Sequence, residues 1–114
     1  EGWSAQRLYA AATEEMHNAN YQKAIDYYQK LESRYPFGKY ALQSQLNIAY
    51  AYYKNDEHDS ALAAIDRFIR LHPDHPAVAY ALYLKGLVNF TRNMGFFSSK
   101  TRQALSREMA SWSW

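Results

Sequence analysis

A period of 37 residues runs through this chain, and it constrains the fold more than any other feature of the sequence. Three pairs of residues keep this separation: Pro36 and Pro73, Ala24 and Ala61, and Ala49 and Gly86. Regular periods of this size are typical of stacked units, because a single unit cannot bury its apolar face alone. The period therefore predicts an array of similar units.

Each unit is predicted to be a pair of helices, because apolar residues recur at helical spacing along most of the chain. The expected helices are Trp3–Asn18, Tyr21–Tyr35, Tyr40–Lys54, Asp59–Leu71, Pro76–Arg92 and Ser99–Trp112. Ser4 and Asn20 are expected to cap the first two helices, since their side-chain oxygens can accept hydrogen bonds from backbone N–H groups. Pro36 and Pro73 mark the ends of units, since proline cannot continue a helix. The small residues are expected where antiparallel helices cross closely.

The unit resembles the tetratricopeptide repeat. The segment NYQKAIDYYQKLESRYP carries that pattern at Tyr21, Ala24, Tyr28 and Pro36. The segment HDSALAAIDRFIRLHP carries it at Ala61, Phe68, Leu71 and Pro73, and departs from it at His58, where an aromatic residue is expected. The resemblance implies an all-α fold of tetratricopeptide-like helix-turn-helix repeats, forming a short right-handed superhelix of about five to six helices. The expected divisions are residues 1–36 (first repeat), 37–73 (second repeat), 74–97 (first helix of the third) and 98–114 (partial insertion or helical tail).

In such arrays the first helix of each unit lines a concave face. Aligned on the small residues, the inner positions are Gln6, Tyr9, Thr13, Met16, His17, Gln43, Leu46, Tyr50, Tyr53, Lys54, Tyr80, Tyr83, Leu87, Phe90 and Thr91. Tyrosine offers a large apolar ring with a polar tip, so this face is expected to bind an extended peptide with aromatic side chains. Asn47 could hold the peptide backbone, since its amide both donates and accepts. The alternative is that these rings pack between repeats.

Longer segments of the sequence indicate a more specific resemblance than the general repeat pattern. WSAQRLYAAA, RYPFGKYALQSQLNIAYAYYK, ALAAIDRFIRLHPDHP and YALYLKGLVNF are similar to the BamD (ComL, YfiO) family of outer-membrane-protein assembly lipoproteins, over residues 3–97. That family has further repeats and a lipidated N-terminal cysteine. This chain is therefore expected to be an N-terminal part, with SSKTRQALSREMASWSW lying in an insertion of the third repeat. The helix expected there should fold back or pack on another molecule.

The resemblance implies a non-catalytic scaffold of the β-barrel assembly machinery, at the periplasmic face of the outer membrane. Its implied ligands are the C-terminal targeting peptides of unfolded outer-membrane proteins. Its implied partners are a BamC-like lipoprotein and the barrel subunit, the latter through C-terminal repeats missing here, and it would meet the membrane only through a lipid anchor absent from this chain. The expected peptide-binding residues are Tyr9, Tyr35, Phe37, Gly38, Asn47, Tyr50, Tyr53, Tyr80, Tyr83 and Phe90.

Two other interpretations remain at this point. The protein could be a purely structural adaptor, whose outer face holds assembly partners with no peptide-binding groove. In the RYPFG turn, Gly38 would then supply backbone freedom and Phe37 would staple two helices. A cytosolic co-chaperone fits less well, because such grooves carry several basic residues that clamp a carboxylate, and here only Lys54 is basic at an inner position.

Other function classes find little support in the sequence. No nucleophile, histidine and acid form a recognisable set, and no glycine-rich phosphate motif occurs, so neither an enzyme nor a cofactor is expected. His72 and His75 lack a third metal ligand at suitable spacing. Residues 85–114 hold five Lys or Arg and one Glu, which is too sparse for a nucleic-acid track and indicates a solvated face. No apolar run approaches the ~20 residues of a membrane span.

Overall fold

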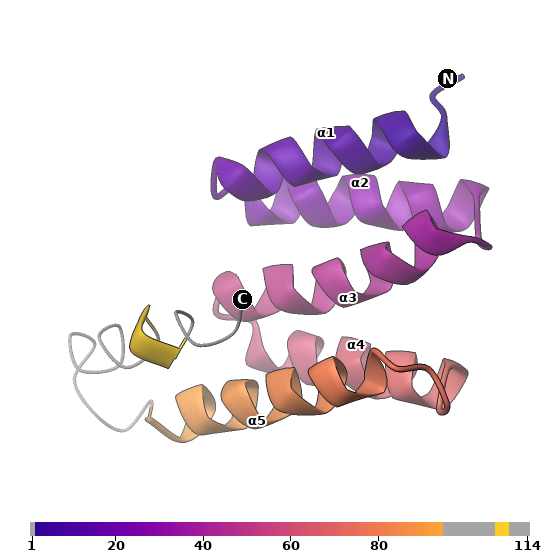
Figure 1. The fold of residues 1–114 in the computed structure, drawn as a ribbon. Helices are drawn as coiled ribbons and strands as arrows, with labels where there is room; N and C mark the ends of the chain where they lie inside the picture. The colour runs from indigo at the N-terminus through magenta and orange to yellow at the C-terminus, as the bar shows by residue number, and fades with distance from the viewer. Residues whose placement is uncertain (1, 95–106, 110–114) are drawn as a thin grey trace.

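The computed structural model describes residues 2–94 and 107–109 of the chain. Five α-helices follow one another along the chain: α1 (Ala5–His17), α2 (Tyr21–Arg34), α3 (Lys39–Lys54), α4 (His58–Leu71) and α5 (Val78–Asn93). Figure 1 shows them stacked in chain order, from α1 and α2 at one end to α4 and α5 at the other. Residues 107–109 are also helical, and the described residues include no strand. The predicted all-α, tetratricopeptide-like fold is therefore confirmed.

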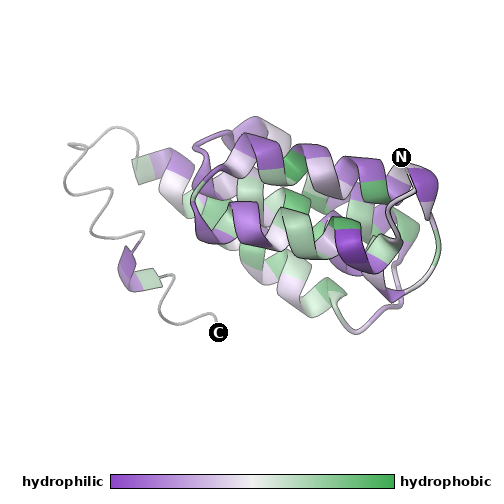
Figure 2. Ribbon diagram, turned by 90° about the horizontal axis from the view of Figure 1, so that it is seen from above, coloured by the Kyte–Doolittle hydropathy of each residue, from purple (hydrophilic) through white to green (hydrophobic). Residues whose placement is uncertain are grey.

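Each helix packs against the next one in the chain, and α3 also touches both α1 and α5. Each helix carries both hydrophilic and hydrophobic residues (Figure 2), as expected for helices that bury one side and expose the other. In the part of the chain that the structure describes, ion pairs link α4 to α2 and α5 to α4 at the surface. They are Arg67–Glu32, Lys85–Asp66 and Arg92–Asp59, with N···O distances of 2.7, 3.0 and 3.0 Å. Because such pairs contribute little in water, apolar packing holds the stack together.

The two predicted caps have different outcomes. The Ser4 Oγ accepts a hydrogen bond from the backbone N–H of Arg7 (3.1 Å), so the cap of α1 is confirmed. Asn20 precedes α2 as expected, but its side chain makes no cap hydrogen bond. It donates instead to Glu15 Oε1 at 2.8 Å, because the tight turn brings a carboxylate of α1 within reach.

Helix α5 begins two residues later than predicted, at Val78 rather than Pro76. The His75 Nδ1 accepts a hydrogen bond from the backbone N–H of Ala77 (2.9 Å), and this contact holds residues 75–77 in a turn. The sixth predicted helix, Ser99–Trp112, is described only at residues 107–109, and the rest of it lies outside the described residues.

The small residues of the period explain how the helices approach each other. Ala24, Ala49 and Ala61 are buried at helix crossings, as predicted. Gly86 is an exception, because it is exposed and no described atom lies within 4 Å of a Cβ built on it. The expectation that Gly86 lies at a close crossing is therefore wrong for the described residues.

Candidate functional site

A groove of about 530 Å³ opens beside α1, α3 and the start of α5. Its lining residues are Tyr9, Thr13, Met16, His17, Tyr28, Gln43, Leu46, Asn47, Tyr50, Ala77 and Tyr80. Eight of the fifteen positions expected to face inward are among them. Residues three or four apart share one side of a helix, which is how α1 and α3 each present several of these side chains together.

A hydrogen-bonded network ties α1, α2 and α3 together at this groove. The Asn47 Nδ2 donates to the hydroxyl oxygens of Tyr9 and Tyr28, each at 3.2 Å. The Gln43 Nε2 donates to Asn47 Oδ1 at 3.1 Å. The Tyr28 hydroxyl also lies 3.2 Å from Thr13 Oγ1. Asn47 is therefore already bonded to protein groups, and its expected role of holding a peptide backbone stays a prediction.

Tyr28 belongs to the groove although the sequence pattern did not predict it there. It comes from α2, and its ring is 1% exposed. The signal that could have found it is chemical, since a buried tyrosine hydroxyl needs a polar partner. Burial raises the pKa of Tyr28 despite its hydrogen bonds with Thr13 and Asn47, so the phenol is neutral at physiological pH.

Aromatic contacts fix the orientation of the rings along the groove. Tyr9 packs against Tyr28 and Tyr40, with ring centroids 5.7 and 5.3 Å apart. Burial raises the pKa of Tyr80, and the neighbouring phenols Tyr50 and Tyr83 add to the shift. Tyr50 and Tyr80 both line the groove, so two more hydroxyl-bearing rings face the site.

Three other expected tyrosine and phenylalanine positions lie outside this groove. Tyr53 is in the core, 5% exposed, with its hydroxyl 3.5 Å from Thr91 Oγ1. Tyr83 and Phe90 lie on α5 and are 41% and 40% exposed, but neither lines the groove. Tyr53 thus packs between repeats, as the alternative interpretation held, and the peptide-binding role of all three remains a prediction.

The remaining inner positions fall into two groups. Leu87 and Thr91 are buried in the protein, and Thr91 Oγ1 donates to the backbone carbonyl of Leu87 at 2.9 Å. Gln6 and Lys54 are exposed and do not line the groove. The groove is therefore lined by fewer of the predicted inner positions than the sequence implied.

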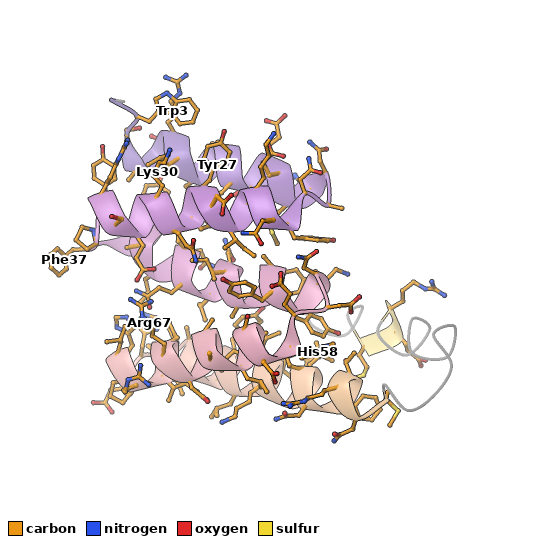
Figure 3. The ribbon with its side chains drawn as sticks, turned by 180° about the vertical axis from the view of Figure 1, so that it is seen from behind. Trp3, Tyr27, Lys30, Phe37, His58 and Arg67 are labelled. Atoms are coloured by element: carbon orange, nitrogen blue, oxygen red, sulfur yellow. The ribbon has the colours of Figure 1, made fainter. Side chains whose placement is uncertain are left out.

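The RYPFG turn connects α2 to α3, apart from the groove. Gly38 has φ of 101°, a backbone conformation that favours glycine, and it directly precedes α3. Tyr35 donates its hydroxyl hydrogen to the backbone carbonyl of Trp3 at 2.6 Å. Phe37 is 90% exposed and points away from the helices (Figure 3). The alternative in which Phe37 staples two helices is therefore wrong.

The groove is lined by aromatic, apolar, hydroxyl and amide side chains and one histidine. None of its lining residues is Lys, Arg, Asp or Glu, and His17 is its sole imidazole. A basic carboxylate clamp of the kind found in co-chaperone repeats is absent from these lining residues. In the parts of the chain that the structure describes, no three His, Asp or Glu side chains gather to hold a metal ion. No helix in those parts is long and apolar enough to cross a bilayer.

Comparison with known proteins places the chain in context. The family model YfiO, described as outer membrane lipoprotein, matches residues 2–111. A protein of Neisseria meningitidis serogroup B named outer membrane protein assembly factor BamD is 53% identical over 103 residues, which cover 90% of this chain and 39% of that protein.

Proteins of the same name from Vibrio cholerae and Xylella fastidiosa are 41% identical over 90 residues and 37% identical over 107 residues. These matches cover 79% and 94% of this chain, and 37% of each relative. The chain therefore spans less than two-fifths of the length of the curated relatives that it matches.

Proposed function

Because the chain belongs to the outer membrane lipoprotein family YfiO, we propose that it contributes to outer membrane protein assembly by binding unfolded client segments in its tyrosine-lined groove. The role is that of a non-catalytic scaffold at the periplasmic face of the outer membrane, reached through a lipid anchor on the whole protein. The preferred clients are C-terminal segments that end in an aromatic residue.

The chemistry of the groove is the observation that supports this proposal most directly. Tyr9, Tyr50 and Tyr80 offer aromatic area for an apolar or aromatic side chain. Gln43 and Thr13 add uncharged polar groups that can pair with a polypeptide backbone. This combination allows the groove to bind many different peptide sequences. Rings and amides contact features that all peptides share, and they do not require one particular pattern of charges.

The rigidity of the groove also supports peptide binding. The network of Asn47 joins three helices, and the ring of Tyr9 is held between two others. Side chains that are already ordered lose little conformational entropy when a ligand arrives. A flexible peptide loses conformational entropy when it binds, so the affinity is expected to be modest.

A separate contact for assembly partners, such as a BamC-like lipoprotein, is proposed at the RYPFG turn. Phe37 is the most exposed large apolar residue among those described, and a lone exposed ring on an ordered turn suits insertion into a partner's pocket. Figure 3 shows that it projects beyond the ends of α2 and α3. This observation keeps the adaptor function as a second candidate, which can coexist with peptide binding.

The test is fluorescence anisotropy of a labelled peptide that ends in the aromatic-terminated strand of an outer-membrane barrel, titrated with this chain. We expect saturable binding that weakens when the terminal aromatic is replaced. Tyr50→Ala should lower the affinity about tenfold, through lost ring contact. Tyr52→Ala is the matched control, because Tyr52 lies on the same helix but does not line the groove.

The two candidate functions give different results in this assay. Phe37→Ala should leave peptide affinity unchanged and weaken capture of the partner lipoprotein. If circular dichroism shows the chain folded and the peptide still does not bind, the groove is not a client site and the adaptor function stands alone. Equal losses from Tyr50→Ala and Tyr52→Ala would also argue against the groove.

A further inference from the structure

The hydrogen bonds at the groove have a direction. The Asn47 side-chain oxygen is occupied by the Nε2 donor of Gln43, at 3.1 Å. Its nitrogen therefore faces the hydroxyl oxygens of Tyr9 and Tyr28, both at 3.2 Å. An amide nitrogen only donates. Both phenol oxygens thus act as acceptors toward Asn47, and each phenol keeps its own hydrogen for another partner.

The two phenols differ in where that hydrogen can go. Tyr28 is buried, and its hydroxyl has Thr13 Oγ1 as a neighbour at 3.2 Å, so its hydrogen has an acceptor. Tyr9 is half-buried and lines the groove. Among the described residues, its hydroxyl makes no hydrogen bond other than the one accepted from Asn47. The Tyr9 hydroxyl hydrogen is therefore available to a group that enters the groove.

The charge of the site limits which acceptor can be bound there. None of the described lining residues is Lys or Arg and His17 is the single imidazole, so a carboxylate that loses water in the groove would have no permanently charged cation beside it. A neutral carbonyl oxygen loses far less on entering such a site. We infer that the groove selects its ligand through a neutral carbonyl oxygen, of a peptide bond or a side-chain amide, that accepts the hydrogen of Tyr9.

This inference rests on the proposed peptide binding and specifies its chemistry. It makes Tyr9 a specificity residue, Asn47 the residue that sets the direction of the Tyr9 hydroxyl, and Gln43 the residue that orients Asn47. Burial raises the pKa of Tyr28, so the second phenol keeps its hydrogen, and Thr13 Oγ1 lies 3.2 Å away as a hydrogen-bond partner. Asn47 then has one constant arrangement of partners at physiological pH.

The first experiment compares Tyr9→Phe with the unchanged 114-residue chain in the peptide titration. Loss of one hydrogen bond should weaken binding about three- to tenfold. Tyr40→Phe is the matched control, because the Tyr40 ring packs against Tyr9 at 5.3 Å but does not line the groove. Unchanged affinity in Tyr9→Phe, with the peptide still bound by the unchanged chain, would overturn the inference and leave the proposed function intact.

The second experiment reverses the direction of the network. In Asn47→Asp the side chain only accepts, so both phenols must turn their hydrogens toward it and Tyr9 offers its oxygen to the ligand. The loss of affinity should equal that of Tyr9→Phe, and the double variant should lose no more than either alone. Additive losses would show that the two residues act separately, which contradicts the inference. Thermal melts of each variant check that the fold survives.

The third experiment varies the probe. The same peptide is titrated with a free C-terminal carboxylate and with a C-terminal amide. We expect the two affinities to lie within about twofold of each other, because the contact with Tyr9 is a hydrogen bond to a neutral carbonyl oxygen that both peptides carry. A tenfold preference for the carboxylate would overturn the inference, since it would require a positively charged side chain that binds the carboxylate. Absence of binding by both peptides to the folded chain would remove the proposed function and this inference with it.

Discussion

Helices α3 and α5 occupy equivalent places in the 37-residue period, yet the same side of each meets a different environment. In α3 this side carries Leu46, Ala49 and Tyr53, all of them buried, and their counterparts in α5 are Tyr83, Gly86 and Phe90, all of them exposed. The α3 side packs against Ala61, Ile65 and Phe68 of α4. Among the described residues, the α5 side meets only the short helical segment 107–109, where the Tyr83 hydroxyl donates to the backbone carbonyl of Met109 at 3.5 Å.

The difference teaches that a position in the repeat does not by itself decide a residue's role. Tyr53 and Phe90 are both aromatic and 37 residues apart, and both were expected to line the concave face. Tyr53 instead lies in the core, in a cluster with residues of both α4 and α5, and Phe90 keeps 40% of its surface exposed. The loss of stability on removing a side chain should therefore depend on whether another helix packs over it, and not on its position in the repeat. Substitutions can test this.

The largest difference is expected between Tyr53→Ala and Phe90→Ala. Removing the buried Tyr53 ring should lower the free energy of unfolding by about 3–5 kcal/mol, through lost burial and a cavity. Removing the exposed Phe90 ring should cost less than about 1 kcal/mol. Urea denaturation followed by circular dichroism measures both. Similar losses would mean that the two sides are equally covered in solution, and the comparison would fail.

A smaller difference is expected when the small residues are enlarged. Ala49→Leu should lower the free energy of unfolding by about 1–3 kcal/mol, because a close helix crossing has no room for extra methyl groups. Gly86→Leu should not destabilise the chain, since nothing described lies within 4 Å of its Cβ position. Differential scanning calorimetry separates the two variants. A fall in the melting temperature of Gly86→Leu would indicate that Gly86 is covered after all.

The smallest expected effect has the opposite sign. Gly86→Ala should raise the free energy of unfolding by about 0.5–1 kcal/mol, because alanine loses less backbone entropy than glycine in a helix interior. The matched change Ala49→Gly should lower it by at least as much, since it also removes a buried methyl group. Chemical denaturation curves of the pair are the measurement, and a destabilised Gly86→Ala would count against an open α5 side.

Much of the fold could be predicted because it depends on neighbours in the sequence. Helix positions follow from apolar residues three and four apart, and the cap of α1 joins Ser4 to Arg7, three residues away. The groove could be predicted in part for the same reason, since Tyr9 and Thr13 share one side of α1 and Leu46 and Tyr50 share one side of α3.

The rest of the site depends on residues that are distant in the sequence. The Asn47 amide reaches Tyr9 across 38 positions and Tyr28 across 19, and no local pattern predicts that these three groups meet. The repeat pattern marked Tyr28 only as an aromatic position, and the structure shows that its hydroxyl joins the network of the groove. Phe37 shows the same limit, because its exposure depends on how two helices diverge at the turn.

The sequence alone therefore determined the units of this protein: the period, the helices and the side of each helix that is apolar. Those features arise from backbone geometry and from interactions over a few residues. The tertiary structure alone decided which of the inner positions stay open to a ligand, because that depends on which helix packs over each side. It made Tyr50 a groove residue and Tyr53 a core residue, although they are three positions apart on one helix.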